Sequence, residues 1–364
     1  MTDSIVLAGG GTAGHVLPAL ATADALIRTH PQVRLTFLGT ERGLESRLVA
    51  EAGHELVAIP AIPMPRRPGG DLVAMPRRWR AAVGAAREVL VSVQAQAVVG
   101  FGGYVSAPAY AAGRAEGTAV VVHESNARPG WANRLGARFA DRVTTAGPDI
   151  KLRGAEPIGI PLRRSITTLD RTATRAEARR YFDLDPDLPT LLAFGGSQGA
   201  RRINSAVFAA SGDLVAGGVQ ILHAVGSAAA GMPEHAADTP GYRVRSYLDR
   251  MDLAYAAADL ALCRAGALTV AELTAVGLPA AYVPLPIGNG EQRLNAEPVV
   301  AAGGGLLIDD SACSAGWVLD TVAPLLRDSE QLTTMAAAAR RSGYTDADEK
   351  LARIVVAATK AKSR

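Results

Sequence analysis

Two glycine-rich segments, each set between an apolar run and a helix-like run, could bind an anion. They are GGGTAGH at residues 9–15 and GGSQG at residues 195–199. Glycine lets a ligand approach the backbone, and the N–H groups that begin a helix favour a negative charge by about 0.3–1 kcal/mol, or ~2 when partly buried. A tight turn is explanation enough for one such loop. Two loops in two halves of the chain favour one ligand held between domains, with a phosphate on one side.

A third segment, residues 263–292, brings a carboxylate to a similar setting. A short apolar strand, 259–262, leads into Arg264-Ala-Gly266 and a helix that stops at Gly277. Glu272 lies in the first turns of that helix, where its carboxylate could accept hydrogen bonds from a vicinal diol such as a ribose. The carboxyl ends of parallel strands are where such sheets bind ligands. A plain strand–helix–strand unit with a solvated glutamate explains the spacing equally well.

Two histidines lie where a general base could act. His15 closes the first glycine loop at the start of a helix, whose positive end disfavours a charged imidazole and so favours a neutral one that can accept a proton. His123, beside Glu124 at the end of a strand, is a second candidate. Either could instead be structural. Neither histidine has a partner at metal-ligand spacing, so we expect no metal site.

The elements that position these residues follow a repeated pattern. Apolar runs of strand length alternate with helical runs, and the order of strand, glycine loop and helix restarts at residue 190. This alternation predicts an α/β protein with two doubly wound parallel-sheet domains. Between them, the charged stretch 167–180 is expected to be poorly ordered, and residues 333–362 are expected to be helical.

Composition narrows the class of protein. The chain has 364 residues, 48% of them hydrophobic, with a net charge of +3 and two cysteines, Cys263 and Cys313. Length and composition suit two globular domains, and two cysteines cannot form a disulfide framework, which fits a reducing compartment. The first residues have no basic segment, so we expect no signal peptide. Residues 92–113 lack charge, but their glycines, glutamines and proline argue against a spanning helix.

A basic amphipathic segment lies between residues 62 and 90. Six arginines face two acidic residues there, and apolar side chains recur at helical spacing from Leu72 to Leu90. Such a segment can lie on an anionic bilayer, each arginine adding about 1 kcal/mol at most. It could equally be an ordinary helix with solvated arginines. The residues predicted to face the membrane are Met64, Arg66, Arg67, Met75, Arg77, Arg78, Trp79 and Arg80.

Six motifs in order along the chain resemble the MurG family of glycosyltransferases. They are GGTAGHVLPALA (10–21), HESN (123–126), GIPLR (159–163), GGSQGA (195–200), CRAGALTVAE (263–272) and EQRLNA (291–296). The resemblance implies the GT-B architecture, with two Rossmann-like domains facing across a cleft: an acceptor- and membrane-facing domain at 1–162, a donor domain at 163–342, and a last helix, 343–364, that returns to the first domain.

The same resemblance implies the reaction and its residues. Family members move N-acetylglucosamine (GlcNAc), with inversion, from UDP-GlcNAc to the muramic-acid 4-hydroxyl of lipid I, forming lipid II for peptidoglycan. They work without a metal or another cofactor, as peripheral proteins on the cytoplasmic side of the cell membrane, and bind no nucleic acid. His15 matches the proposed base. The positions that match substrate-binding residues are Thr12, Ala13, Gly14, Asn126, Arg163, Ser197, Leu248, Ala267, Leu268, Thr269, Val270, Ala271, Glu272 and Gln292.

Three other functions are compatible with parts of the pattern. Gly9-x-Gly11-x-x-Gly14 is formally a dinucleotide fingerprint, with Glu41 just beyond the second strand, so an NAD(P)-dependent oxidoreductase is one alternative. A UDP-sugar epimerase on a similar scaffold is another. A UDP-sugar-binding regulator at the membrane would bind the donor without transferring the sugar.

Overall fold

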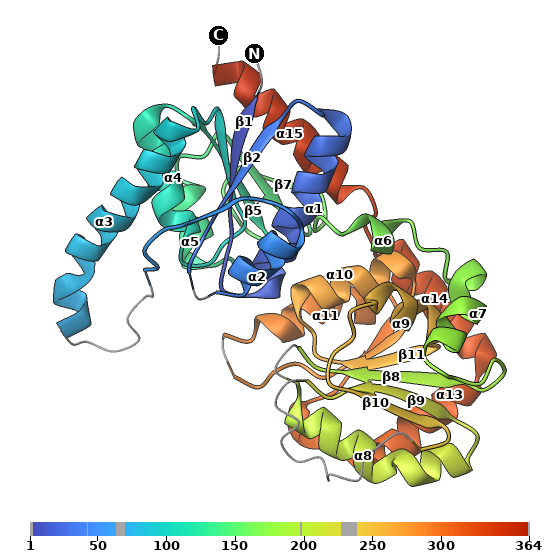
Figure 1. The fold of residues 1–364 in the computed structure, drawn as a ribbon. Coiled ribbons are helices and arrows are strands. Elements are labelled where there is room, and N and C mark those ends of the chain that lie inside the picture. Colours follow the sequence, from blue (N-terminus) through green and yellow to red (C-terminus); the bar gives the residue numbers. More distant parts are fainter. Residues whose placement is uncertain are drawn as a thin grey trace. The chain divides into compact units, whose positions relative to one another are not determined.

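The chain divides into two compact units, each built on one parallel sheet (Figure 1). The first unit comprises Met1–Arg163 and Thr345–Arg364, and the second comprises Arg164–Tyr344. The structure is a computed structural model that describes residues 3–41, 43–62, 70–196, 199–226, 239–287 and 289–362, with the backbone alone at 70–73. The two-domain α/β class predicted from the alternating pattern is confirmed.

The sheet of the first unit has seven strands in the order β3-β2-β1-β4-β5-β6-β7. Strands β1 and β4 are neighbours at the centre of the sheet. The chain passes from β1 to β2 on one side of this pair, and from β4 to β5 on the other side. The carboxyl ends of β1 and β4 therefore flank a topological switch point, the place where such sheets bind ligands. The strands are β1 (Ser4–Ala8), β2 (Arg34–Gly39), β3 (Leu56–Ala58), β4 (Ala97–Gly100), β5 (Ala119–Glu124), β6 (Arg142–Thr145) and β7 (Ala155–Pro157).

Helices cover both faces of this sheet, so its central strands are apolar throughout. In β1, Ile5 and Leu7 pack in a core with α1 and α15, whereas Val6 and Ala8 pack in a second core with α3 and α4. This division follows from the alternation of side chains along a strand. The helices are α1 (Ala13–Thr29), α2 (Leu44–Glu51), α3 (Gly70–Ser92), α4 (Ser106–Glu116), α5 (Trp131–Gly136) and α15 (Ala347–Lys362).

The second unit repeats this plan with six strands in the order β10-β9-β8-β11-β12-β13. Its switch point lies between β8 and β11. The strands are β8 (Thr190–Phe194), β9 (Gln220–Ala224), β10 (Tyr242–Arg245), β11 (Leu260–Cys263), β12 (Ala280–Tyr282) and β13 (Gly305–Leu307). The helices are α6 (Arg164–Thr167), α7 (Arg171–Tyr181), α8 (Arg201–Ala216), α9 (Met251–Ala257), α10 (Ala267–Val276), α11 (Glu291–Ala301), α12 (Ala315–Trp317), α13 (Ala323–Arg327) and α14 (Ser329–Arg341), with a 3-10 turn at Asp310–Ala312 and a π-helical turn at Val318–Val322.

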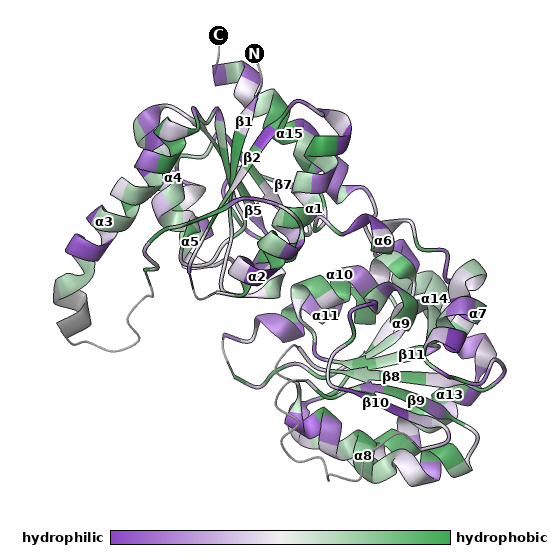
Figure 2. Ribbon diagram, viewed as in Figure 1, coloured by the Kyte–Doolittle hydropathy of each residue, from purple (hydrophilic) through white to green (hydrophobic). Residues whose placement is uncertain are grey.

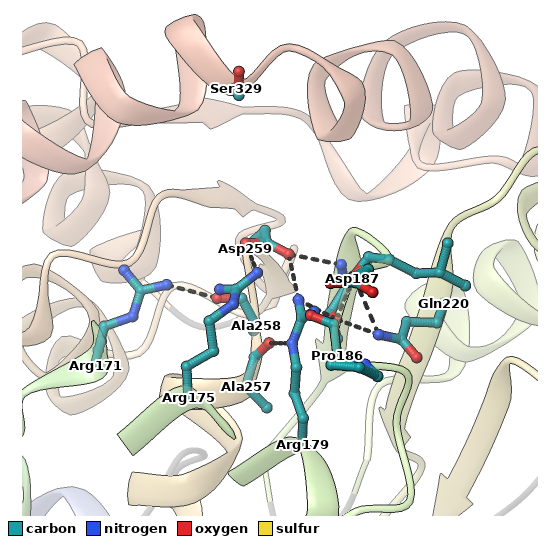
Figure 3. A network of polar contacts seen from close by, with 12 residues as sticks. Arg171, Arg175, Arg179, Pro186, Asp187, Gln220, Ala257, Ala258, Asp259 and Ser329 are labelled. Atoms are coloured by element: carbon teal, nitrogen blue, oxygen red, sulfur yellow. Dashed lines mark hydrogen bonds and ion pairs between the residues drawn. The ribbon is translucent and has the colours of Figure 1, made fainter. Parts of the chain in front are cut away.

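The prediction of a poorly ordered stretch at 167–180 is wrong. Asp170 caps α7 by accepting from the N–H groups of Thr172 and Ala173. Three arginines of this helix, Arg171, Arg175 and Arg179, belong to one polar network (Figure 3). Arg175 and Arg179 reach the carboxylate of Asp259 at 2.6 and 3.0 Å. Part of the high charge of the stretch therefore belongs to a structural ion-pair network.

Arg171 belongs to the same network and caps two helices. Its guanidinium donates to the carbonyls of Tyr255 and Ala258, at the end of α9, and of Gly277, which ends α10. Carbonyls at a helix C-terminus have no partner within the helix and carry partial negative charge, so a cation stabilises them. Arg171 thus fixes the far end of the helix that carries Glu272.

Helix α3 is amphipathic, with hydrophobic and hydrophilic residues alternating along it (Figure 2). Ala82, Ala86 and Leu90 are buried against the first unit, while Arg77 and Arg80 are exposed. Trp79 and Met75 are half-buried and Arg78 is exposed. Met64, Arg66 and Arg67 lie outside the described residues. Within the parts of the chain that the structure describes, no helix has the length and apolarity needed to cross a membrane.

Candidate active site

His15 lies in the first turn of α1, directly after the glycine loop that follows β1. Its Nδ1 is 2.9 Å from the carbonyl oxygen of Gly10 and 3.3 Å from Thr12 Oγ1. A carbonyl oxygen can only accept, so Nδ1 carries the proton and Nε2 of the neutral ring keeps its lone pair. The ring lies against Gly102 in the loop after β4, where an added Cβ would be 3.0 Å from Nε2. Among the described residues, the hydrogen bonds of the ring are made by Nδ1, and Nε2 has no hydrogen-bond partner.

The glycine loop itself is held by a buried carboxylate. The N–H of Gly11 donates to Glu45 Oε2 at 2.9 Å, and Glu45 is fully buried at the start of α2. The Gly11 N–H is therefore already used, and a negative charge lies beneath the loop. The Gly11 N–H is thus not available to an anion, whereas the prediction for the other N–H groups of the loop stays a prediction. Thr12, Ala13 and Gly14 begin α1 with no side-chain cap, and they remain predicted substrate contacts.

His123 is not an accessible base. Its ring is fully buried, with Nδ1 3.0 Å from Thr144 Oγ1, and its Nε2 has no partner within the described chain. Burial disfavours the charged ring and lowers the pKa of His123 to about 3. The second candidate for the base is therefore a structural residue, as the alternative interpretation held.

Glu124, the next residue, organises the loop that carries Asn126. The Oε1 of Glu124 accepts two hydrogen bonds from Asn126, one from the backbone N–H at 2.9 Å and one from the side-chain Nδ2 at 3.3 Å. Its Oε2 accepts from Gly130 N–H and from Asn133 Nδ2, both at 2.9 Å. Asn133 in turn accepts from the hydroxyl of the buried Tyr110 at 2.7 Å. Asn126, a predicted substrate contact, is thus fixed at the carboxyl end of β5, half-buried.

In the second unit, α10 begins with N–H groups that no side chain caps. Its N-cap is Gly266, and residues 267–269 are half-buried at the switch point between β8 and β11. A ten-residue helix that starts in this way offers its first amides and its positive end to an anion. Val270 is buried, and Ala271, the residue before Glu272, is half-buried.

Glu272 points inward from α10 and is held by a neighbouring helix. It is 6% exposed, and the hydroxyl of Tyr255 on α9 donates to its Oε2 at 2.8 Å. A carboxylate held in this way has a fixed orientation. The interpretation of Glu272 as a freely solvated side chain is wrong.

The remaining predicted residues of the second unit lie at the same sheet edge. Gln292, in the first turn of α11, accepts from the N–H of Leu285 through Oε1 at 3.0 Å, which fixes its side chain. Leu248 is buried just before α9. Arg264, which precedes the start of α10 but is not one of the predicted contacts, donates to the carboxylate of Asp310 at 2.6 Å and to the Val283 carbonyl at 3.1 Å, so its charge is compensated inside the protein.

For two predicted substrate contacts, Ser197 and Arg163, the structure gives little about the side chain. Ser197 lies outside the described residues, although the flanking turn is tight: the N–H of Gly199 donates to the carbonyl of Gly196 at 2.7 Å. Arg163 is half-buried at the end of the first unit, and its predicted role stays a prediction. Among the described residues, no group of three or more His, Cys, Asp or Glu side chains is arranged to hold a metal ion.

Comparison with known proteins decides the family. Residues 5–145 match the glycosyltransferase family 28 N-terminal domain, and residues 190–351 match its C-terminal domain. A UDP-N-acetylglucosamine–N-acetylmuramyl-(pentapeptide) pyrophosphoryl-undecaprenol N-acetylglucosamine transferase of Streptomyces avermitilis is 58% identical, over 99% of both chains. The chain belongs to glycosyltransferase family 28.

Two further family relatives agree. A transferase of the same name from Mycolicibacterium smegmatis is 57% identical, over 97% of this chain and 93% of the relative. The crystal structure of Acinetobacter baumannii MurG matches with a TM-score of 0.77 at 27% identity, covering 98% of this chain and 100% of that one. The resemblance drawn from the six motifs is confirmed, and this family 28 chain is a glycosyltransferase.

Within each unit, the family 28 motifs meet at one sheet edge. The motif residues around His15 and Asn126 follow β1 and β5, and those around Glu272 and Gln292 follow β11 and β12. Sequence reasoning missed the residues that hold them: Glu45, Glu124, Asn133 and Tyr255. Only Glu124 had a visible signal, because it lies inside the HESN motif.

Proposed function

We propose that this glycosyltransferase moves GlcNAc from UDP-GlcNAc to the muramic-acid 4-hydroxyl of lipid I, giving lipid II. The observation that carries the proposal is the 58% identity over 99% of the chain to a transferase named for that reaction. Neither the oxidoreductase nor the epimerase alternative is favoured, because the curated relatives are transferases. A regulator without activity is disfavoured for the same reason.

In the proposed reaction, the second unit binds the donor. Glu272, oriented by Tyr255, accepts hydrogen bonds from the ribose hydroxyls. The diphosphate lies at the start of α10, whose uncapped amides stabilise the charge that develops on the leaving UDP. Gln292 keeps its amide nitrogen for the sugar hydroxyls, since its oxygen is bound to Leu285.

The first unit binds and activates the acceptor. The acceptor hydroxyl attacks the anomeric carbon on the face opposite UDP, so the product has the inverted configuration. Its proton passes to Nε2 of His15, which carries the lone pair because Nδ1 donates to Gly10. A base of this kind contributes about 10²–10⁴-fold to the rate.

Transfer of radiolabelled GlcNAc from UDP-GlcNAc to a lipid I analogue tests the assignment, with and without a chelator. His15→Ala should lower turnover by about 10²–10⁴-fold and leave the affinity for UDP-GlcNAc unchanged. His30→Ala, at the other end of α1, is the control. No transfer by the unaltered protein would refute the reaction, and full turnover by His15→Ala would refute the base.

We also propose that α3 places the protein on an anionic membrane surface, on the cytoplasmic side, where a lipid-linked acceptor is presented. The exposed Arg77, Arg78 and Arg80 beside the half-buried Trp79 support this. Co-sedimentation should be stronger with liposomes that contain anionic lipid than with neutral ones, and a triple Arg→Gln variant should abolish the difference. Equal binding to both kinds of liposome would contradict it.

A further inference from the structure

The carboxylate of Glu45 and the imidazole of His15 contact the two ends of the same peptide unit. The peptide between Gly10 and Gly11 donates its N–H to Glu45 Oε2 at 2.9 Å, and its carbonyl accepts from His15 Nδ1 at 2.9 Å. Hydrogen bonds in a chain polarise one another, and a charged acceptor at one end strengthens the next bond. A negative charge on Glu45 therefore increases the electron density on the Gly10 carbonyl oxygen that holds the ring.

We propose that Glu45 is a positioning residue for His15, acting through the Gly10–Gly11 peptide unit. In this arrangement Glu45 keeps His15 in the tautomer with its proton on Nδ1 and its lone pair on Nε2. When Nε2 takes the proton of the acceptor hydroxyl, the ring becomes an imidazolium, and the polarised carbonyl stabilises that charge. Glu45 stays ionised and exchanges no proton. The inference rests on the proposed role of His15 as the base.

The fit of Glu45 into its site is closely determined. A Cβ added at Gly10 would lie 2.5 Å from Glu45 Oε1, one at Gly39 would lie 2.6 Å from its Cγ, and one at Gly43 would overlap its carboxylate. Three glycines from separate parts of the chain thus leave the space that this side chain fills.

Glu45 is also held as an ion. Its Oε1 accepts from the backbone N–H of Thr40 at 2.9 Å and from the Thr40 hydroxyl at 2.7 Å. Burial by itself would raise the pKa of Glu45, but the hydrogen bonds from Gly11 and Thr40 outweigh it, so the pKa lies below its ordinary value. In each of these bonds Glu45 is the acceptor, as an ionised carboxylate must be.

The test is Glu45→Gln, which keeps the shape of the side chain and removes its charge. We expect kcat for GlcNAc transfer to fall on the order of ten- to a hundredfold, the scale known for carboxylates that orient a metal-bound histidine, with KM for UDP-GlcNAc unchanged. Glu51→Gln is the matched control, because Glu51 is an exposed residue of the same helix that pairs with Arg47. It should retain full kcat.

Nitrogen-15 NMR of the imidazole separates positioning from folding. In the unaltered protein the His15 ring should carry its proton on Nδ1, and in Glu45→Gln the Nε2–H tautomer should gain population. A His15 ring protonated on Nε2 in the unaltered protein would overturn the proposal even if the variant failed to fold. So would an unchanged tautomer, or unchanged kcat, in a folded Glu45→Gln protein. Failure of His15 as the base would show separately, as full turnover by His15→Ala.

Discussion

Arg179 should be the most stabilising single side chain of the second unit, and its removal gives a quantitative test of the fold. The residue is 1% exposed, lies on α7 and donates five hydrogen bonds to oxygen atoms. Figure 3 shows it inside the polar network around Asp259. The acceptors are the carbonyls of Ala257 and Asp185, each at 3.2 Å, the carbonyl of Pro186, the hydroxyl of Thr190 at 3.0 Å and the carboxylate of Asp259 at 3.0 Å.

Replacing Arg179 with methionine should destabilise the second unit by about 3–5 kcal/mol. Removing one partner of a buried ion pair has an effect of this size because the groups that it paired with lose compensation. Asp259 keeps Arg175 and the Thr190 N–H, which bounds the loss, whereas the buried carbonyls lose their donor. Since whole domains are stable by about 5–15 kcal/mol, the variant should unfold at a much lower urea concentration.

Urea unfolding followed by tryptophan fluorescence can report on this unit alone. Trp317 lies in the second unit, whereas Trp79 and Trp131 belong to the first and can be replaced by phenylalanine. Arg180→Met, which removes an exposed arginine from the neighbouring position, should change the free energy of unfolding by less than about 0.5 kcal/mol. A loss below about 1 kcal/mol for Arg179→Met would refute the reasoning.

Two further outcomes follow from buried polar groups. Tyr255→Phe removes the hydrogen bond to Glu272 and should weaken UDP-GlcNAc binding, measured by calorimetry, about tenfold, which is equivalent to ~1.4 kcal/mol. The control is Tyr282→Phe, which deletes a buried hydroxyl with no partner in the described chain and should leave the affinity unchanged. Equal effects of the two substitutions would contradict the role of Tyr255. Burial lowers the pKa of His223 to about 4 and that of His123 to about 3. As the pH falls from 6.5 to 4, the unfolded chain therefore takes up protons that the folded chain does not. The free energy of unfolding should decrease over this range. Urea titrations over this range should show a smaller decrease for His223→Gln, and an equal one would count against this source.

The local motifs were predictable from the sequence, because their signals lie within a few residues. Each glycine loop lies beside the strand and helix that it joins, so His15 and Glu272 could be placed at strand ends without knowing the fold. Their supports could not be predicted in this way. Glu45 contacts Gly11 across 34 positions, and Tyr255 reaches Glu272 from another helix. Such pairs become neighbours only when the sheet order is known.

The mistaken prediction at 167–180 has the same cause. A run rich in arginine is typical of a solvated segment when its partners are unknown. Asp259, which compensates Arg179, lies 80 positions away, and the carbonyls that Arg171 caps belong to helices 84 to 106 positions away. Charge in a sequence therefore indicates burial or exposure only once the opposite charge has been located.

The return of the final helix to the first unit decides how the protein can be dissected. Leu351, Val355 and Val356 of α15 are buried in the same core as Ile5 and Leu7 of β1. Residues 164–344 are thus one uninterrupted stretch that could be expressed by itself. The other half needs its last twenty residues spliced back on. Shortening the carboxyl terminus would consequently harm the half that begins the chain.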